Sequence, residues 1–197
     1  MDYGLCNLNI IPLRLEDSDC SEMVSQVLYG DLFEILEISE KWCKVRLVDD
    51  QYEGWIDNKQ FKKISLSEFE ELNKKTPKLS THLLDIITTG TNTLLPISIG
   101  SNTAISKFLN HSFEGATTSK KLNKSNLTEF AQMYLNSPYL WGGKTPFGID
   151  CSGFTQMVYK LCGYQLFRDA SQQVNQGEVL SFIEESEAGD LAFFDNE

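Results

Sequence analysis

Short runs in which apolar and polar residues alternate occupy the first 64 residues of the chain. From 43 to 47, apolar side chains alternate with Lys44 and Arg46, and the preceding run from 33 to 38 is rich in β-forming residues. Gly-Asp and Asp-Asp pairs separate these runs, as turn-forming residues separate strands. Several short strands at this spacing predict a small β-barrel over residues 1–64 rather than a helical unit.

The pattern becomes more polar after this first unit. Residues 65–75 begin with a serine and carry acidic side chains early, which predicts a short helix that ends at Pro77. From 79 to 119 the chain is rich in Thr, Ser, Asn and Gly, with short β-prone pieces such as 85–89. We expect a second, degenerate barrel in this region.

Helical spacing appears in the stretch that follows. Apolar residues recur at helical intervals from Leu127 to Tyr134, and Asn126 and Glu129 have the spacing of a capping pair. Pro138 follows as a stop signal. The sequence therefore predicts a helix that begins at Asn126.

The segment from 139 to 154, YLWGGKTPFGIDCSGF, carries the candidate chemistry. Three glycines and a proline come shortly before Cys151, which predicts a tight loop whose backbone passes close to its neighbours. Apolar residues from Phe154 to Leu161 then share one helical face, and Gly163 supplies a stop. Cys151 is therefore expected at the N-terminus of a buried helix.

A cysteine in that position is suited to nucleophilic catalysis. The thiolate is the reactive form, and the positive end of a helix stabilises negative charge. The unpaired N–H groups of the first turn can also receive an oxyanion. Asp150 opposes thiolate formation where it is charged, so we assign it to helix capping or to binding a substrate amine. On its own, however, an Asp-Cys-Ser-Gly sequence more often marks an N-cap beside a buried thiol.

Composition and charge narrow the classes of function. The 197 residues are 41% hydrophobic and 23% charged, as in an average globular protein. No apolar run approaches the roughly 18 residues of a membrane span, and the net charge of −11 argues against nucleic acid and anionic membranes as partners. No secretory signal is apparent, so we expect a cytoplasmic protein. We also expect a monomer. The five cysteines match neither a zinc-ligand set nor a disulfide framework, and we expect no metal or other cofactor.

Three segments near the N-terminus share the features of one kind of small domain. They are residues 21–30 (SEMVSQVLYG), Trp42-x-x-Val45 and Tyr52-Glu-Gly-Trp-Ile56. Together they resemble the bacterial SH3-like domains attached to cell-wall enzymes, with a generic small β-barrel as the alternative. We therefore divide the chain into an SH3-like domain (1–64), a linker helix (65–78), a second, degenerate SH3-like domain (79–120) and a C-terminal domain (124–197).

Four ordered segments characterise the C-terminal domain. They are Tyr139-x-Trp-Gly-Gly143, Pro146-x-Gly-x-Asp-Cys-Ser-Gly-Phe154, Arg168-Asp-Ala-Ser-x-Gln173 with Gly177, and Gly189-Asp-Leu-Ala-Phe-Phe194. Together they resemble the NlpC-type cysteine peptidases, papain-like enzymes that cut bacterial cell-wall peptides. The resemblance implies an α+β fold class, in which SH3-like barrels precede a papain-like peptidase domain that is incomplete at its C-terminus.

The resemblance also implies roles for four residues. Cys151 attacks the amide carbonyl and forms a thioester that water later releases. Tyr139 lines the site and helps with the oxyanion, and a buried core tyrosine is an alternative of equal weight. Trp141 shapes the pocket wall, and Ser152 presents its hydroxyl or its N–H to the substrate.

SH3-like domains joined to this peptidase resemble the dipeptidyl-peptidase VI type. That type hydrolyses γ-D-glutamyl–diamino acid bonds in murein peptides with a free N-terminal L-alanine, in peptidoglycan recycling or turnover. The resemblance implies that Asp169 binds the free amine and that Glu22 and Tyr52 close one end of the cleft. An ammonium among carboxylates is bound strongly, whereas an acylated N-terminus leaves them buried and unpaired. The alternative role for Asp169 is that of a helix N-cap.

The resemblance further implies a catalytic histidine just after the Gly-Asp-Leu-Ala-Phe-Phe motif. The two histidines of the chain, His82 and His111, lie upstream instead. We therefore interpret the chain as C-terminally truncated and expect negligible peptidase activity from these residues alone. The alternatives are a non-catalytic module or pseudoenzyme that binds wall peptides, and the same fold with amidase or acyl-transfer chemistry.

Overall fold

The computed structural model describes residues 2–194, and its N-terminal part is one antiparallel sheet of seven strands. The strands are β1 (Asp2–Leu5), β2 (Ile10–Arg14), β3 (Met23–Leu28), β4 (Leu32–Ile38), β5 (Trp42–Leu47), β6 (Glu53–Asp57) and β7 (Lys62–Ile64), in the spatial order β3-β2-β6-β5-β4-β1-β7. In β5 the apolar positions 43, 45 and 47 are buried, while Lys44 and Arg46 pair with Glu53 on β6. The alternation predicted for β5 is confirmed.

The helix α1 (Leu66–Asn73) follows the sheet and covers one of its edges. Ser65 Oγ accepts from the N–H of Glu68 at 3.3 Å, and the Glu68 carboxylate accepts from the N–H of Ser65 at 2.7 Å. This reciprocal capping box satisfies two of the free donors at the helix start. The apolar face of α1 packs Phe69 against Tyr3 of β1, with ring centroids 4.1 Å apart. The short helix predicted here is confirmed.

The chain from 79 to 118 forms two small sheets and a 3₁₀ helix. The elements are β8 (Leu79–Ser80), β9 (Leu84–Thr88), β10 (Leu94–Ser98), η1 (Thr103–Leu109) and β11 (Thr117–Thr118), with β9 paired to β10 and β8 to β11. Ile87, Ile97 and Ile105 are fully buried in a core shared with Leu5 and Tyr29 of the seven-stranded sheet unit. This region therefore packs on the first sheet, and the proposed second barrel and the domain boundaries stay predictions.

The C-terminal part consists of short helices and one small strand pair joined by long loops. Its elements are α2 (Lys124–Met133), the short pair β12 (Lys144–Thr145) and β13 (Gly148–Ile149), α3 (Cys151–Leu161), α4 (Ala170–Gln173) and η2 (Ile183–Glu185). The predicted start of α2 at Asn126 is wrong, because Asn123 occupies the N-cap position. Asn126 lies inside the helix, where its amide donates to the Glu129 carboxylate at 3.2 Å.

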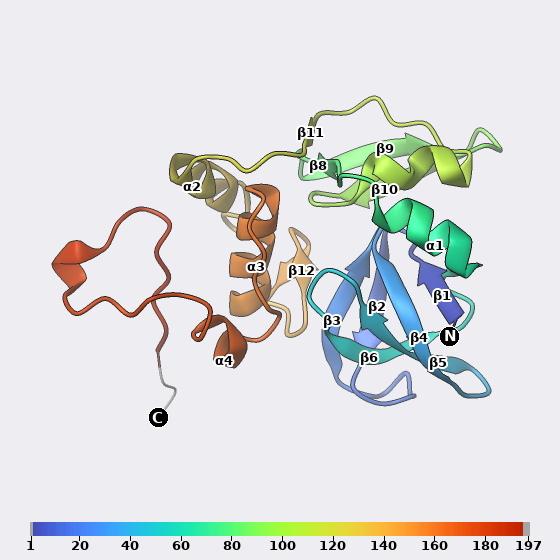
Figure 1. Cartoon of the computed structure of the whole chain (residues 1–197), viewed down its shortest axis with the longest axis horizontal. Coiled ribbons are helices and arrows are strands. Elements are labelled where there is room, and N and C mark those ends of the chain that lie inside the picture. The colour runs from blue at the N-terminus through green and yellow to red at the C-terminus, as the bar shows by residue number, and fades with distance from the viewer. Residues whose placement is uncertain (1, 195–197) are drawn as a thin grey trace.

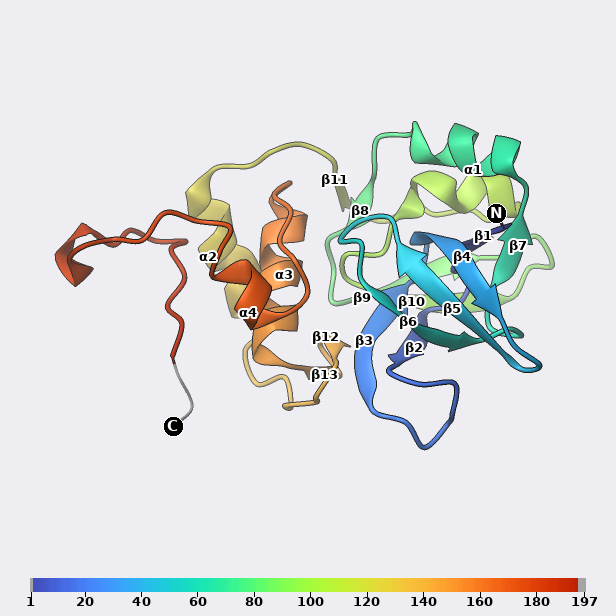
Figure 2. The same cartoon turned by 60° about the horizontal axis from the view of Figure 1, so that its bottom comes forward.

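The helix α3 joins the two parts of the molecule. Figures 1 and 2 both show α3 beside α2, with the β12–β13 pair between α3 and β3. Met157 and Leu161 of α3 are fully buried in a core that also contains Leu28 of β3, Leu79 and Ile99. Burial of this apolar face fixes α3 against the sheet unit. No helix within residues 2–194 is long and apolar enough to cross a membrane.

Candidate active site

Cys151 is the first residue of α3, and its side chain is exposed. The N-cap residue Asp150 has an extended backbone, and its Oδ1 accepts from the N–H of Gly153 at 2.7 Å. The predicted helix start and the capping role of Asp150 are therefore present together. The thiol is therefore exposed at a helix N-terminus, beside the free N–H groups of the first turn. The alternative of a buried structural thiol does not apply to Cys151.

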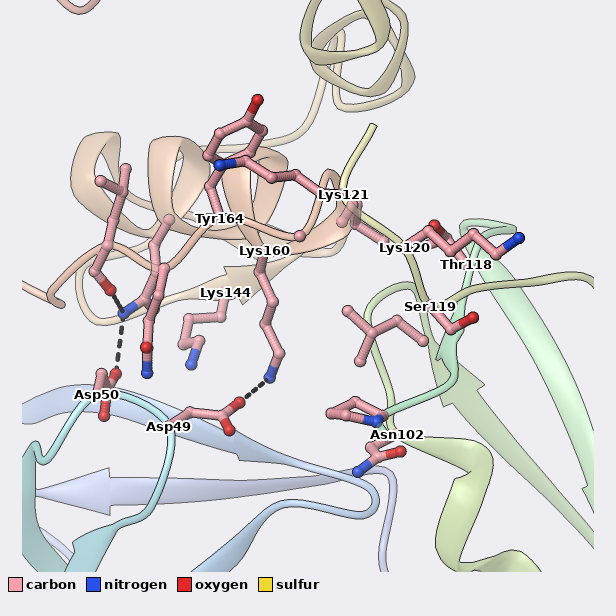
Figure 3. Close-up of a pocket in the computed structure, with 17 residues that line it drawn as sticks. Asp49, Asp50, Asn102, Thr118, Ser119, Lys120, Lys121, Lys144, Lys160 and Tyr164 are labelled. Carbon is pink, nitrogen blue, oxygen red and sulfur yellow. Dashed lines mark hydrogen bonds and ion pairs between the residues drawn. The ribbon is translucent and has the colours of Figure 1, made fainter. Parts of the chain in front are cut away.

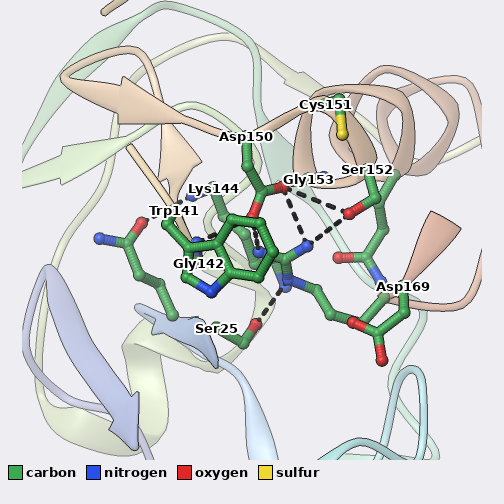
Figure 4. A network of polar contacts seen from close by, with 12 residues as sticks. Ser25, Trp141, Gly142, Lys144, Asp150, Cys151, Ser152, Gly153 and Asp169 are labelled. Atoms are coloured by element: carbon green, nitrogen blue, oxygen red, sulfur yellow. Dashed lines mark hydrogen bonds and ion pairs between the residues drawn. The ribbon is translucent and has the colours of Figure 1, made fainter. Parts of the chain in front are cut away.

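Asp150 is held from a second direction by Arg168, which is 1% exposed. The guanidinium donates to both carboxylate oxygens, with Nη1 3.0 Å from Oδ1 and Nη2 2.6 Å from Oδ2 (Figure 4). Asp150 Oδ2 also accepts from the N–H of Gly142 at 2.8 Å. Both oxygens of this carboxylate are therefore occupied by groups of the protein itself.

Arg168 also connects the loop before α4 to the seven-stranded sheet. Its Nε donates to Ser25 Oγ of β3 at 3.0 Å, and its Nη1 donates to Ser152 Oγ at 2.9 Å. One buried side chain thus positions β3, the start of α3 and the Asp150 cap. Reasoning from the sequence missed this role of Arg168. The one signal was its place directly before Asp169 in the Arg-Asp-Ala-Ser motif, and that place does not indicate a buried partner.

The loop before Cys151 needs glycine at position 142. Gly142 has φ +76°, and a Cβ placed there would lie 2.2 Å from the backbone oxygen of Met23 in β3. Neither the dihedral nor the contact is open to an L-residue with a side chain. The loop can therefore approach β3 closely enough for Lys144 N–H to donate to Gln26 Oε1 at 2.7 Å.

Two residues of the sheet unit reach the loops around Cys151. Trp141 Nε1 donates to Glu22 Oε1 at 2.5 Å, and the Tyr52 hydroxyl donates to Asp169 Oδ1 at 3.1 Å. Burial, followed by the nearby charge of Asp169, raises the pKa of Tyr52, so this phenol stays protonated and keeps donating. The structure thus brings together four of the residues selected from the sequence, in two pairs that each cross between the two parts of the chain.

Tyr139 and Ser152 differ in how they can meet a ligand. Tyr139 is 67% exposed, so it is not the buried core residue of the alternative interpretation. The pKa of its phenol is raised by desolvation and by the negative charges of Cys151 and Asp150. Ser152 is buried instead, and its hydroxyl contacts Asp150 and Arg168 rather than pointing outward.

Neither histidine hydrogen-bonds to Cys151 in the described structure. His111 Nδ1 lies 3.0 Å from the Tyr29 hydroxyl, and His82 Nδ1 lies 3.1 Å from Asp85 Oδ1. Burial lowers the pKa of His111, which favours its neutral form. A base for Cys151 is therefore not supplied by either ring in this arrangement. Within residues 2–194, no three His, Cys, Asp or Glu side chains gather as metal ligands would.

The five thiols should differ sharply in their reaction with iodoacetamide. Cys151 and Cys20 are exposed, whereas burial raises the pKa of Cys162 to about 11 and also raises that of Cys6. Because alkylation requires an accessible thiolate, we expect Cys151 and Cys20 to be labelled in the folded protein, with Cys151 the faster.

Peptide mass spectrometry after timed labelling measures these rates. Cys20 is the matched control, because it is exposed but does not begin a helix. Labelling of Cys151 only after addition of denaturant would contradict the placement of this thiol.

Comparison with known families places two domain types on the chain. Residues 13–61 match the bacterial dipeptidyl-peptidase SH3 domain, and residues 136–197 match the NlpC/P60 family. A crystal structure of an NlpC/P60 family protein from Bacillus cereus aligns with a TM-score of 0.75 at 19% identity, covering 94% of this chain and 80% of that one. An NlpC/P60 endopeptidase from Photobacterium damselae aligns with a TM-score of 0.68 at 15% identity, covering 88% and 45%. These structures share the fold.

Sequence relatives carry more specific names. A gamma-D-glutamyl-L-lysine dipeptidyl-peptidase of Bacillus subtilis is 35% identical over 88 residues, and dipeptidyl-peptidase 6 of Lysinibacillus sphaericus is 39% identical over 90 residues. Each alignment covers 45% of this chain, and the aligned part spans 29% and 31% of those relatives. The chain thus has a mixed α/β fold in which a segment that matches the bacterial dipeptidyl-peptidase SH3 domain precedes a segment that matches the NlpC/P60 family.

Proposed function

We propose that this chain forms part of a cysteine peptidase that hydrolyses the γ-D-glutamyl–diamino acid bond of murein peptides with a free N-terminal L-alanine. The observation that carries the proposal is the pair of contacts Glu22–Trp141 and Tyr52–Asp169, which join the sheet unit to the loops before and after α3, the helix that begins with the exposed Cys151. The names of the sequence relatives support the same bond specificity.

The proposed chemistry begins with attack of Cys151 Sγ on the carbonyl carbon of the γ-glutamyl amide. A thioester S–C bond forms, the C–N bond breaks, and the amine of the diamino acid leaves with a proton. Water then hydrolyses the thioester, which releases L-Ala-γ-D-Glu and restores the thiol. The N–H groups at the start of α3 and the exposed Tyr139 hydroxyl are suited to hold the oxyanion.

The proposed specificity depends on the amine of the substrate. Asp169 and Glu22 supply carboxylates, and Tyr52 presents its ring and hydroxyl beside Asp169. An ammonium group placed there replaces its hydration by charge-assisted hydrogen bonds, which are about twice as strong as neutral ones. An acetylated amine has no charge, so the carboxylates would be desolvated without compensation. We assign Asp150 to positioning rather than to the amine, because its oxygens already accept from Arg168.

A calorimetric titration tests the amine pocket. We expect L-Ala-γ-D-Glu-L-Lys to bind the Cys151→Ala variant, and Asp169→Asn to weaken this binding at least about tenfold, since a charged partner of the ammonium is lost. Asparagine is a good N-cap residue, so α4 keeps its start and the melting temperature should stay unchanged.

The matched control is Asp57→Asn, which removes a carboxylate that accepts from Lys59 N–H in a turn. It should leave the affinity unchanged. Equal affinity of the N-acetylated tripeptide, or of Asp169→Asn, would rule out the proposed amine pocket.

One observation favours a second candidate, a module that binds wall peptides without cleaving them. Both histidines of these 197 residues are engaged with Tyr29 and Asp85, so Cys151 lacks a histidine base in this arrangement. Residues 1–197 alone are therefore expected to bind the tripeptide with negligible turnover. An activated substrate distinguishes the two candidates, since its reaction with a thiol does not need a strong base. The peptidase candidate predicts that Cys151 becomes acylated, and the binding-module candidate predicts that it does not.

A further inference from the structure

A separate cavity lies where α3 meets the turn between β5 and β6. It has a volume of about 360 Å³, within the size range of small-molecule sites, and residues from both parts of the chain line it. Figure 3 shows Asp49 and Asp50 on one side and Lys160 and Tyr164 on the other. None of the eight residues selected for the peptidase site lines this cavity.

The charge of the lining is opposite to that of the whole chain. Four lysines and two aspartates line the cavity, whereas the chain has a net charge of −11. The two aspartates are engaged within the protein, because Asp49 lies 2.6 Å from Lys160 Nζ and Asp50 accepts from Gln156 Nε2 at 2.9 Å. The buried Asp31 also pairs with Lys160, so four lysines face three aspartates, and the one remaining positive charge favours an anionic ligand.

Lys144 supplies the central cation of the cavity. This residue is only 3% exposed, and its side chain extends from β12 to lie between Lys160 and Asp50 (Figure 3). Among residues 2–194 no salt bridge is formed by its Nζ, and Asp50 and Asp31 are the carboxylates whose charges act on it. Burial lowers the pKa of Lys144, so an anion beside it would stabilise its charged form. A buried ammonium that no carboxylate hydrogen-bonds is costly, and the carboxylate of a ligand would supply that hydrogen bond.

Gln156 provides the complementary acceptor. Its Nε2 donates to Asp50 and to the backbone oxygen of Leu166, but its Oε1 is buried without a donor among the described residues. An unsatisfied buried carbonyl costs about 1–3 kcal/mol, so it is rarely left without a role. A ligand that meets Lys144 and Gln156 together must carry an anionic group and an N–H or O–H close to it.

The cavity is also lined by apolar residues and by two exposed lysines. Leu79, Leu161 and Leu166 are the apolar residues, and the exposed Lys120 and Lys121 add positive charge, with Lys121 Nζ 4.4 Å from the centre of the Tyr164 ring. An apolar side chain next to the anionic group would therefore be buried favourably.

We propose that this cavity is a second binding site, which takes a small carboxylate whose α carbon carries an N–H group and an apolar side chain. An acylated amino acid and the C-terminal residue of a short peptide share this chemistry. The carboxylate would pair with Lys144 and be attracted by Lys120 and Lys121, and the N–H would donate to Gln156 Oε1. The site does not depend on the proposed peptidase activity.

Calorimetric titration of the 197-residue chain with each enantiomer of N-acetylleucine tests this proposal. We expect saturable binding of at least one enantiomer, and no binding of the matching amide, which lacks the negative charge. Lys144→Met should weaken the affinity at least about tenfold, because the pairing cation is lost while the length of the side chain is kept. Lys121→Ala at the exposed rim should weaken it several-fold.

The matched control is Lys107→Met, which removes a lysine of η1 that does not line the cavity. It should bind like the unmodified chain. The proposal is wrong if neither enantiomer binds, if the amide binds equally well, if folded Lys144→Met binds normally, or if inorganic phosphate binds more tightly. Circular dichroism reports folding, and if Lys144→Met does not fold, unchanged binding by Lys121→Ala overturns the proposal.

Discussion

The substitution Arg168→Met is expected to lower the free energy of unfolding by about 3–5 kcal/mol, because it leaves the buried Asp150 carboxylate without its cation. The guanidinium is 1% exposed and contacts both oxygens of Asp150, so water cannot replace it. The change also breaks the contacts of Arg168 with Ser25 and Ser152. Because Asp150 caps the helix that begins at Cys151, the start of α3 should lose its fixed geometry.

Urea denaturation of Arg168→Met and of the unmodified chain measures this effect. The matched control is Arg46→Met, which breaks an arginine–carboxylate pair whose members are both 36% exposed. Exposed pairs contribute little, so its cost should stay below about 1 kcal/mol. Adding Asp150→Asn to Arg168→Met should recover part of the loss, since the buried charge is then removed. Equal costs for the two arginine substitutions would contradict the role given to Arg168.

The second large effect is expected for Lys160→Met, which removes the ion pairs that hold α3 to the sheet unit. Lys160 Nζ lies 3.2 Å from Asp31 Oδ1 and 2.6 Å from Asp49 Oδ2, and the Asp31 side chain is 7% exposed. Burial works against the Lys160 ammonium, but the two carboxylates outweigh it and raise its pKa. Loss of one partner from such a buried group costs about 3–5 kcal/mol at neutral pH.

This cost should depend on pH in a defined direction. Lys160 holds the pKa of Asp49 below its usual range. This shift stabilises the fold above about pH 4, and the stabilisation is lost as the pH falls. Burial already raises the pKa of Asp31, and removing Lys160 raises it further, so the variant loses stability as the pH rises above about 4. Both effects make the difference between Lys160→Met and the unmodified chain larger at pH 7 than at pH 4.

Thermal unfolding at several pH values measures the difference. Lys75→Met is the control, since Lys75 is 36% exposed and pairs with the exposed Glu71 four residues earlier. That pair should contribute less than about 0.5 kcal/mol at any pH. A cost of Lys160→Met that stays constant or grows toward pH 4 would rule out the ion-pair explanation.

Local patterns predicted local structure well. The alternation in β5, the serine-capped α1 and the start of α3 at Cys151 all depend on neighbours within a few residues, and all are present. The start of α2 was missed because two asparagines three residues apart both suit an N-cap. Asn123 takes that position, and Asn126 bonds to Glu129 within the helix.

Contacts between distant parts of the chain required different information. Trp141 and Glu22 are 119 residues apart, and Tyr52 and Asp169 are 117 residues apart. No spacing rule connects them, and only the family resemblance selected Glu22, Tyr52 and Asp169 for one site. Their roles toward a substrate stay predictions, as do those of Cys151 and Tyr139.

Interactions that have no motif were not predictable from the sequence. The pairing of Arg168 with Asp150 depends on the loop between α3 and α4, which returns to the N-cap of α3. Likewise, Lys144 follows two glycines in a motif and gives no sign of being buried, yet it is 3% exposed in the structure. Tertiary packing decides which charged side chains are removed from water, and a single sequence does not specify that packing.

The acylation of Cys151 by an activated substrate tests the central claim most directly. A thioester of L-Ala-γ-D-Glu with thiophenol is mixed with the 197-residue chain, and the intact mass is followed over time. Attack by Sγ forms a new thioester, thiophenolate leaves, and the thiol proton goes to solvent. We predict one added L-Ala-γ-D-Glu acyl group on Cys151, absent in Cys151→Ala and much reduced for the N-acetylated thioester. Acylation of Cys20 at the same rate, or none on Cys151, would contradict the account.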